Sequence, residues 1–306
     1  MKKCPRNRGN FNFSATTEKL LQYADLAMYQ AKQMGRNTHS FFEQALNSRA
    51  VARQSVESEL RRALDRDELV LHYQPKYDLA SGRVNGVEAL VRWQHPRRGL
   101  LGPDEFLSVA EDCGLIVPIG RWVLQRACRQ ARAWLDEGLP FDHVAVNACA
   151  LEFRRIDFVQ GIAAALSGAG LEAKHLELEL TEGVLMLDTG ASVATLQSLS
   201  AMGVSIAVDD FGTGYSSLSY LRRFPIDVLK IDKTFIQDLG TGVGDAAIVR
   251  AIIALGTSLE YRVIAEGVET PQQLALLHAQ HCCEGQGFLF SRPLAADALA
   301  MLLRAP

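Results

Sequence analysis

The chain lacks the features that define several large classes of protein. No apolar run in its 306 residues approaches the roughly 20 residues that a membrane-spanning helix needs. The basic opening, MKKCPRNRGN, is not followed by the hydrophobic stretch of a secretory signal. The net charge of −3 shows no basic excess of the kind found in proteins that bind DNA or RNA duplexes. These absences predict a globular protein of the cytoplasm.

Cysteine is scarce, and its spacing argues against the common cysteine-based sites. The six residues are Cys4, Cys113, Cys128, Cys149, Cys282 and Cys283. Because none forms a CxxC pair and a chain of this length does not depend on disulfides, we expect reduced thiols. His278 and His281 lie three residues apart on a predicted helix and could share a metal ion, but we favour a solvated helix face.

What the sequence does contain is a regular alternation of short apolar runs and longer helical patterns. Predicted strands cover residues 69–75, 84–93, 143–148, 176–182, 205–211, 228–232, 262–268 and 285–290. Predicted helices separate them at 121–138, 158–170, 191–203, 247–260 and 270–280. Eight strands with helical spacers indicate parallel βαβ units. The count favours an α/β fold of the closed (β/α)8 barrel type over an open doubly wound sheet.

A smaller, helical part precedes the barrel pattern. Apolar residues recur at three- and four-residue steps from Leu20 to Ala31, which predicts an amphipathic helix that ends near Gly35. Residues 44–66 predict a second helix that leads into the main domain. Because a segment of about 40 residues rarely builds its own core, we expect the first part to dock on a neighbour or to stay loose.

Oxygen-bearing and charged side chains lie near the ends of the predicted strands: Glu88, Asn147, Glu179, Asp209, Asp210, Lys230, Glu266 and Gln286. In a barrel these ends meet at one rim, where the chemistry of such folds is found. A single acid there would be an ordinary solvated strand end. In one pocket with the asparagine, the five carboxylates would repel one another unless some were protonated or bound to metal. Their all-oxygen chemistry predicts Mg²⁺ or Mn²⁺ rather than Zn²⁺.

The two adjacent aspartates lead directly into a glycine-rich turn, in AVDDFGTGYSS at residues 207–217. The GxG spacing suits a phosphate cradle, but GxGxxG is incomplete because Ser217 occupies its last position. A tight turn followed by a serine helix cap explains the same residues. Since two bare aspartates would repel a phosphate, a phosphate site here would need metal ions.

Six motifs in order resemble the EAL domain, a family of bacterial phosphodiesterases that linearise cyclic di-GMP. They are VEALVRW (87–93), ELTE (179–182), DDFGTGYSS (209–217), LKID (229–232), AEGVET (265–270) and QGFLFSRPL (286–294). The resemblance covers about residues 57–304 and implies a (β/α)8-type barrel whose first strand runs antiparallel. The sequence departs from the usual pattern of the family at two positions, Cys149 in NACA and Ala295 in PLA. Neither change removes an implied metal ligand.

Residues 24–37, ADLAMYQAKQMGRN, are similar to the last helix of a GGDEF domain. The rest of that domain is missing, so we expect no cyclase activity. The domain organisation implied is a GGDEF remnant at 1–43, a helical linker at 44–56 and an EAL barrel at 57–306. An upstream sensory domain, with or without a membrane anchor, is expected in a longer parent protein.

The resemblance also implies roles for individual residues. The ligands of two metal ions would be Glu88, Asn147, Glu179, Asp209, Asp210 and Glu266, with Asp209 bridging the ions. Lys230 would contact the attacking water, and Glu266 would act as a base. The residues that bind the substrate's guanine and phosphate groups would be Gln74, Arg92 and Gln286. Glu182 and Thr213 would support the loop at 210–217, which couples dimerisation to metal binding in the family.

The function implied is Mg²⁺- or Mn²⁺-dependent hydrolysis of cyclic di-GMP to linear 5′-pGpG, by a homodimer. The main alternative is a catalytically silent EAL module that senses cyclic di-GMP or binds a protein partner. A metal-dependent lyase with an enolase-like barrel would also place acids at strand ends, but it does not account for the ordered motifs.

Overall fold

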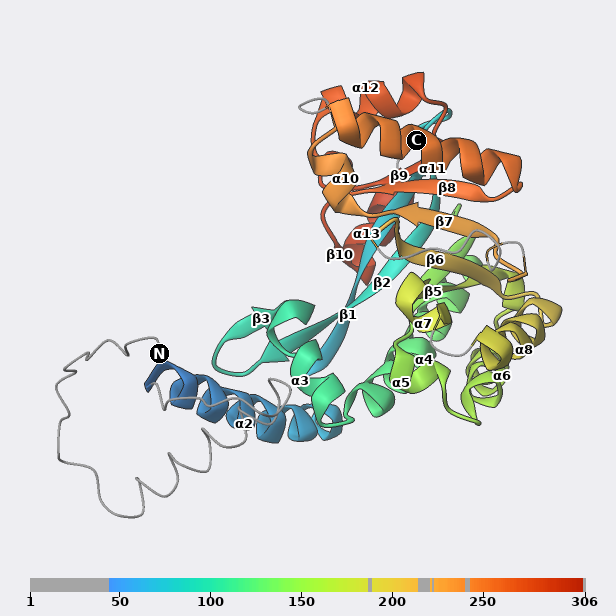
Figure 1. Cartoon of the computed structure of the whole chain (residues 1–306). Coiled ribbons are helices and arrows are strands. Elements are labelled where there is room, and N and C mark those ends of the chain that lie inside the picture. Colours follow the sequence, from blue (N-terminus) through green and yellow to red (C-terminus); the bar gives the residue numbers. More distant parts are fainter. Residues whose placement is uncertain (1–43, 187–188, 214–220, 222, 240–242, 305–306) are drawn as a thin grey trace, which may run out of the picture. The chain divides into compact units, whose positions relative to one another are not determined.

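The structure is a computed structural model that describes residues 44–186, 189–213, 221, 223–239 and 243–304 (Figure 1). Contacts divide the chain into two units, residues 1–59 and 60–306, and the fold described here is that of the second. The helix α2 (Gln44–Asp65) confirms the predicted second helix and runs without a break across the predicted boundary at residue 57. The predicted amphipathic helix and GGDEF remnant lie outside the described residues.

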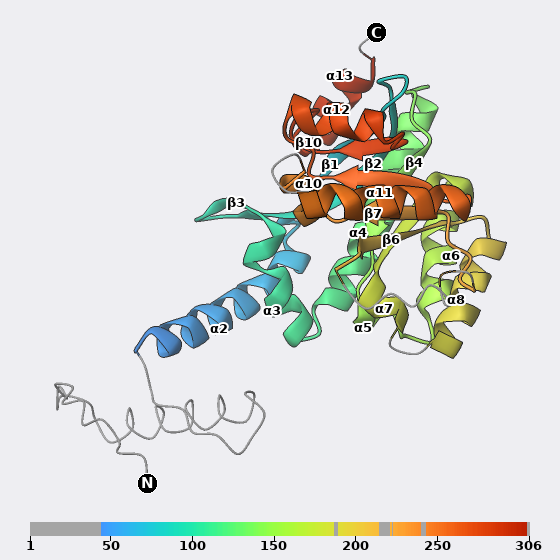
Figure 2. The same cartoon turned by 45° about the horizontal axis from the view of Figure 1, so that its top comes forward.

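Eight strands of the described chain close into a barrel (Figures 1 and 2). In order around the barrel they are β1 (Leu69–Asp78), β2 (Val84–His95), β4 (His143–Asn147), β5 (Leu176–Thr181), β6 (Ser205–Phe211), β7 (Val228–Ile231), β8 (Arg262–Glu266) and β9 (Glu284–Gln286). Neighbours from β2 to β9 are parallel, whereas β1 is antiparallel to both β2 and β9 and so closes the ring. The predicted barrel with an antiparallel first strand is confirmed.

Helices cover the outside of this ring (Figure 2). The longer ones are α4 (Ile116–Asp136), α6 (Phe158–Ala169), α8 (Thr189–Ala201), α11 (Val243–Ser258), α12 (Pro271–Ala279) and α13 (Ala296–Arg304). The first five confirm the predicted spacers. In α4, apolar residues at three- and four-residue steps form one buried stripe, which includes Ile119, Val123, Ala127 and Trp134. None of the described helices has the length and apolarity that a bilayer crossing requires.

The short elements were not predicted, and they connect or flank the barrel strands. They are β3 (Gly99–Leu101), β10 (Leu294–Ala295), α3 (Leu107–Asp112), α5 (Ala150–Phe153), α7 (Glu182–Met186), α10 (Lys233–Gln237) and two 3₁₀ turns at Pro103–Glu105 and Ala173–His175. The predicted strand at 285–290 is wrong beyond Gln286. There the backbone turns, and the Phe290 amide donates a hydrogen bond to the Gly287 carbonyl at 3.2 Å.

Strand alternation fills the barrel in layers. On β6, β7 and β8 one inward layer is a buried apolar cluster of Ala207, Val228 and Ile264. Two residues further along the same strands come Asp209, Lys230 and Glu266. On these three strands the apolar cluster lies beneath the charged side chains, and the charged layer lies toward the carboxyl ends of the parallel strands.

Candidate active site

Lys230 on β7 holds three carboxylates from three other strands. Its ammonium nitrogen lies 2.6 Å from Glu179 Oε2, 2.7 Å from Glu266 Oε1 and 3.2 Å from Asp209 Oδ1. The Lys230 side chain is 1% exposed, and its charge is therefore enclosed by the acids that surround it. Four of the predicted site residues, far apart in the sequence, meet here.

A second group of hydrogen bonds links Glu88 of β2 to side chains of β4 and β9. The Asn147 side-chain amide donates to Glu88 Oε1 and the Gln286 amide donates to Glu88 Oε2, both at 2.7 Å. Gln286 also donates to Gln74 Oε1 at 3.1 Å, and Gln74 donates to the Ser291 carbonyl at 3.2 Å. The Glu88 carboxylate is thereby oriented by one amide from β4 and another from β9.

Asp209 and Asp210 end β6 in a conformation that turns both carboxyl groups toward one place. Asp210 has a positive φ of 52°, and its backbone amide donates to Asp209 Oδ1 at 2.9 Å. One oxygen each from Asp209, Asp210 and Glu266 lies within 4.8 Å of the others. Asp210 is also hydrogen-bonded to Asp232, the residue that caps α10 through the Thr234 amide.

Burial and the closeness of these acids to other charged groups shift their pKa values. Burial, with the Asp209 carboxylate, raises the pKa of Glu266 to about 8 in spite of the Lys230 ammonium. Burial and Asp209 also raise the pKa of Asp210 to about 6. The pKa of Glu88 is raised by burial and by Glu179. For Glu179, burial works in the same direction, but the ammonium groups of Lys230 and Lys76 outweigh it and lower its pKa. The site therefore holds carboxyl groups of both kinds, ionised and protonated.

A cavity of about 290 Å³ opens beside Glu88 and Glu266. Its walls include Gln74, Glu88, Glu266 and Gln286, together with Lys233 of α10 and Phe288. The volume lies near the lower end of the range for small-molecule sites, about 300–1,000 Å³. Phe288 is 49% exposed, and the Arg292 guanidinium lies 4.3 Å from the centre of its ring. The rim thus offers an aromatic face and cations above an acidic floor.

The other predicted residues lie further out. Arg92 is half-buried on β2, four residues after Glu88 and on the same face of the strand. Its guanidinium donates to the Val91 carbonyl at 2.8 Å. Glu182 begins α7 and is buried, and its Oε2 has no hydrogen-bond partner in the described part of the chain. Thr213 donates through its hydroxyl to the Asp210 carbonyl at 2.9 Å. Residues 214–217 of the predicted loop lie outside the described residues.

Sequence reasoning missed Lys76, Asp232, Lys233 and Phe288. Lys76 is fully buried in the barrel and contacts both Glu177 and Glu179. A lysine within an alternating strand is more often solvated, so no local pattern marks it. The other three directly follow or lie within motifs that the sequence does show, LKID and QGFLFSRPL, and could have been included on that ground.

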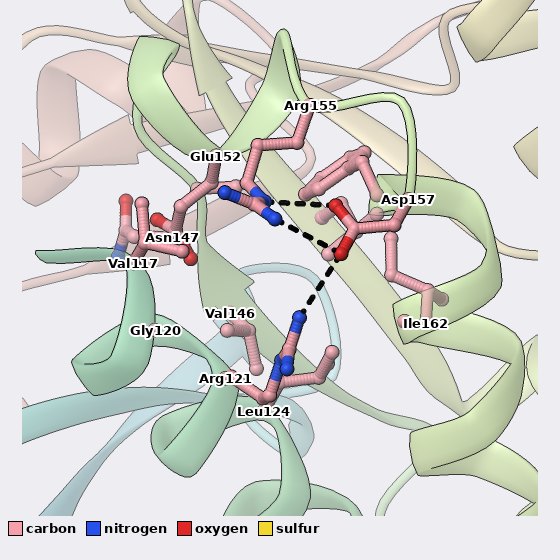
Figure 3. Close-up of a pocket in the computed structure, with 14 residues that line it drawn as sticks. Val117, Gly120, Arg121, Leu124, Val146, Asn147, Glu152, Arg155, Asp157 and Ile162 are labelled. Atoms are coloured by element: carbon pink, nitrogen blue, oxygen red, sulfur yellow. Dashed lines mark hydrogen bonds and ion pairs between the residues drawn. The ribbon is translucent and has the colours of Figure 1, made fainter.

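Another cavity lies on the other side of Asn147, between α4, α5 and α6 (Figure 3). Its walls are mainly apolar, and at its rim Asp157 pairs with Arg155 at 2.8 Å and with Arg121 at 3.3 Å. Its volume is about 50 Å³. Since one water takes roughly 30 Å³, this space holds one or two waters and is too small for a nucleotide.

The oxygen donors that meet at this end of the barrel fit hard divalent cations. They consist of carboxylate oxygens and the Asn147 amide oxygen, which Mg²⁺ and Mn²⁺ prefer, and no histidine or cysteine is among these residues. The three clustered acids Asp209, Asp210 and Glu266 have the spacing of oxygens around one ion or a close pair. The residues present could therefore hold metal.

The EAL-domain sequence profile matches residues 57–293, about three quarters of the chain. The chain belongs to the EAL-domain family. The family predicted from the motifs is thereby confirmed, and its barrel is the one that the structure shows.

Two relatives from Pseudomonas aeruginosa are each 50% identical to this EAL chain. They are the bifunctional diguanylate cyclase/cyclic di-GMP phosphodiesterase MucR, over 284 residues, and the cyclic di-GMP phosphodiesterase NbdA, over 288 residues. The matches cover 93% and 94% of this chain but only 42% of MucR and 37% of NbdA. The solved PaMucR phosphodiesterase in complex with c-di-GMP is 51% identical, with a TM-score of 0.78 over 80% of this chain and 99% of the other.

Proposed function

We propose that this EAL chain is a metal-dependent phosphodiesterase that hydrolyses one 3′–5′ bond of cyclic di-GMP and releases linear 5′-pGpG. The observation that carries the proposal is the meeting of Glu88, Glu179, Asp209, Asp210 and Glu266 at the carboxyl ends of the strands, with Glu88 and Glu266 in the wall of a cavity. The two relatives that are 50% identical to this chain are named as cyclic di-GMP phosphodiesterases, and the proposal extends that activity to this chain.

The proposed ligands of two Mg²⁺ or Mn²⁺ ions are Glu88, Asn147, Glu179, Asp209, Asp210 and Glu266. Bound ions would offset the acidic floor, attract a dianionic dinucleotide and lower the pKa of a bound water. The chain's own residues would do the rest. Lys230, which contacts three of the ligands, would orient the attacking water, and Glu266 would accept its proton.

The walls of the cavity suit the two ends of the substrate. The proposed contacts to guanine and phosphate are Gln74, Arg92 and Gln286, and the Arg92 guanidinium supplies the forked donors that phosphate favours. Phe288, half-exposed on the rim, would add a face for stacking on a base. Glu182 and Thr213 would support the loop at 210–217, and we propose a homodimer as the active form.

Incubation of the chain with cyclic di-GMP and Mg²⁺ or Mn²⁺, with nucleotides separated by chromatography, tests the proposal. We expect loss of cyclic di-GMP and stoichiometric appearance of pGpG, both abolished by EDTA. Retention of bound but intact cyclic di-GMP would identify a sensor instead. A reaction that proceeds equally well in EDTA would rule out the metal-dependent chemistry.

A further inference from the structure

The interior of the barrel contains a second lysine, below the site. Lys76 on β1 is fully buried, and its ammonium nitrogen lies 2.7 Å from Glu179 Oε1. The other oxygen of the same carboxylate, Oε2, accepts from Lys230 at 2.6 Å. Glu179 is therefore held at both oxygens, by one ammonium from β1 and another from β7.

We propose that Lys76 is a positioning residue that fixes the Glu179 carboxylate for metal binding. This inference rests on the proposed function, which makes Glu179 a metal ligand. Each carboxylate oxygen has lone pairs for two partners, so an oxygen that accepts from a lysine can still bind an ion. With two donors in place, Glu179 has one orientation rather than several.

Lys76 is itself anchored from below. Its nitrogen lies 2.6 Å from Glu177 Oε1, and Glu177 Oε2 lies 2.7 Å from the Arg262 guanidinium. Arg262 also pairs with Glu284 at 3.0 Å. Alternating charges thus run along the barrel from Arg262 through Glu177 and Lys76 to Glu179.

Charge balance alone does not explain the position of Lys76. Without it, Glu177 would keep Arg262 as a partner, and Glu179 would keep Lys230. Neither buried carboxylate would lose its last cation, which is the change that costs a folded protein most. What the Lys76→Met variant loses is the second donor to Glu179, while a side chain of similar length still fills the space.

The experiment is a Mn²⁺ titration of the metal-free full chain without substrate, followed by calorimetry or by the electron spin resonance of free Mn²⁺. The titration is run at a pH where Glu179 is ionised in both proteins, because the Lys76 ammonium also lowers the pKa of that carboxyl group. If Lys76 acted only through its charge, Lys76→Met would then bind the cation more tightly, because a positive charge near the site is gone. Positioning predicts the opposite, a loss of at least about tenfold, as for other groups that orient metal ligands. Unchanged or tighter binding overturns the inference.

Two further variants separate positioning from a general structural role. Glu177→Gln weakens the anchor but keeps the contact between Lys76 and Glu179, so its Mn²⁺ affinity should stay near that of the native chain. Lys174→Met removes an exposed lysine, paired with Glu172 at 2.8 Å, and should change nothing. If Lys76→Met does not fold, Lys76→Leu, which also lacks a donor, replaces it, and affinity equal to or above that of the native chain again overturns the inference.

The titration also keeps this inference apart from the proposed function. A chain that hydrolyses cyclic di-GMP, and whose Lys76→Met variant binds Mn²⁺ as tightly, contradicts the role of Lys76 alone. A chain that binds Mn²⁺ through Lys76-dependent ligands, yet leaves cyclic di-GMP intact, contradicts the proposed function alone.

Discussion

Glu88 depends on side chains from two other strands for its orientation, Asn147 of β4 and Gln286 of β9. Replacing it with alanine removes a proposed metal ligand and leaves those two amides facing the open cavity, where water can satisfy them. We expect Glu88→Ala to lower turnover of cyclic di-GMP by more than about 100-fold, beyond the effect of losing a group that only orients a ligand. The melting temperature should stay close to that of the native chain.

A matched control for this variant is Glu172→Ala, which removes an exposed carboxylate that pairs with Lys174. Its turnover should equal that of the native chain. Near-native hydrolysis by Glu88→Ala would contradict the proposed set of ligands.

The raised pKa values of Glu266 and Asp210, to about 8 and about 6, predict how metal binding depends on pH. Both groups hold protons in the metal-free chain below these values, and a cation must displace those protons. Mn²⁺ affinity should therefore fall as the pH falls from 9 to 5, by up to about tenfold per unit for each displaced proton. Titrations at several pH values measure this. Glu266→Gln should remove the upper transition, and an affinity independent of pH would contradict the prediction.

At the scale of single residues, the sequence predicts the acids of the site well and its interior cations unevenly. Glu179 and Asp209 stand in recognisable motifs at strand ends, and Lys230 lies in LKID. Lys76 directly follows the predicted strand at 69–75, and a lysine just past the end of a strand is ordinarily solvated. Its partner Glu177 is 101 residues away, so only closure of the barrel shows that the two meet.

At the scale of elements, the approach of β9 to the turn after β8 sets the position of Gln286. The Val268 amide donates to the Gln286 carbonyl at 3.1 Å, and a β-carbon on Gly287 would lie 2.1 Å from the Val268 carbonyl oxygen. Because that oxygen belongs to the backbone, the two segments would have to separate. We expect Gly287→Ala to destabilise the fold by about 1–3 kcal/mol and to lower turnover.

Thermal unfolding followed by circular dichroism measures this effect, and Gly168→Ala is the control. Gly168 lies near the end of α6 with no atom within 4 Å of its added β-carbon, so alanine there should be neutral or stabilise by up to about 1 kcal/mol. Equal melting temperatures for the two variants would show that β9 and the turn after β8 can move apart without loss of stability.

Most of the eight strands were predictable because they combine an apolar core with a polar end, and residues 205–211 of β6 match the prediction at both ends. The five long spacer helices were predictable from their length. The short α5, α7 and α10, of four to five residues each, carry too few turns for periodicity to appear. The end of β9 was misread because Phe288, Leu289 and Phe290 are apolar, although the backbone turns there.

At the scale of the whole molecule, the predicted division into a GGDEF remnant, a linker and a barrel leads to a deletion experiment. A chain that lacks residues 1–43 should keep the melting temperature and the kcat/KM of the whole chain, because every residue of the proposed site lies between Gln74 and Phe288. A large loss of turnover without unfolding would show that the first segment acts on the site. Sedimentation of both chains would test the proposed homodimer.

Because β1 is antiparallel to its neighbours, its first residue, Leu69, pairs with Trp93, five residues beyond Glu88 along β2. The polypeptide thus enters the barrel at the carboxyl ends of the parallel strands, where the acids of the site lie, and not at their amino ends. In a barrel of eight parallel strands, a pull on the preceding segment would act on the opposite end. Here any tension or rotation passed down the backbone before Leu69 would instead act on the end of the barrel that holds the proposed site.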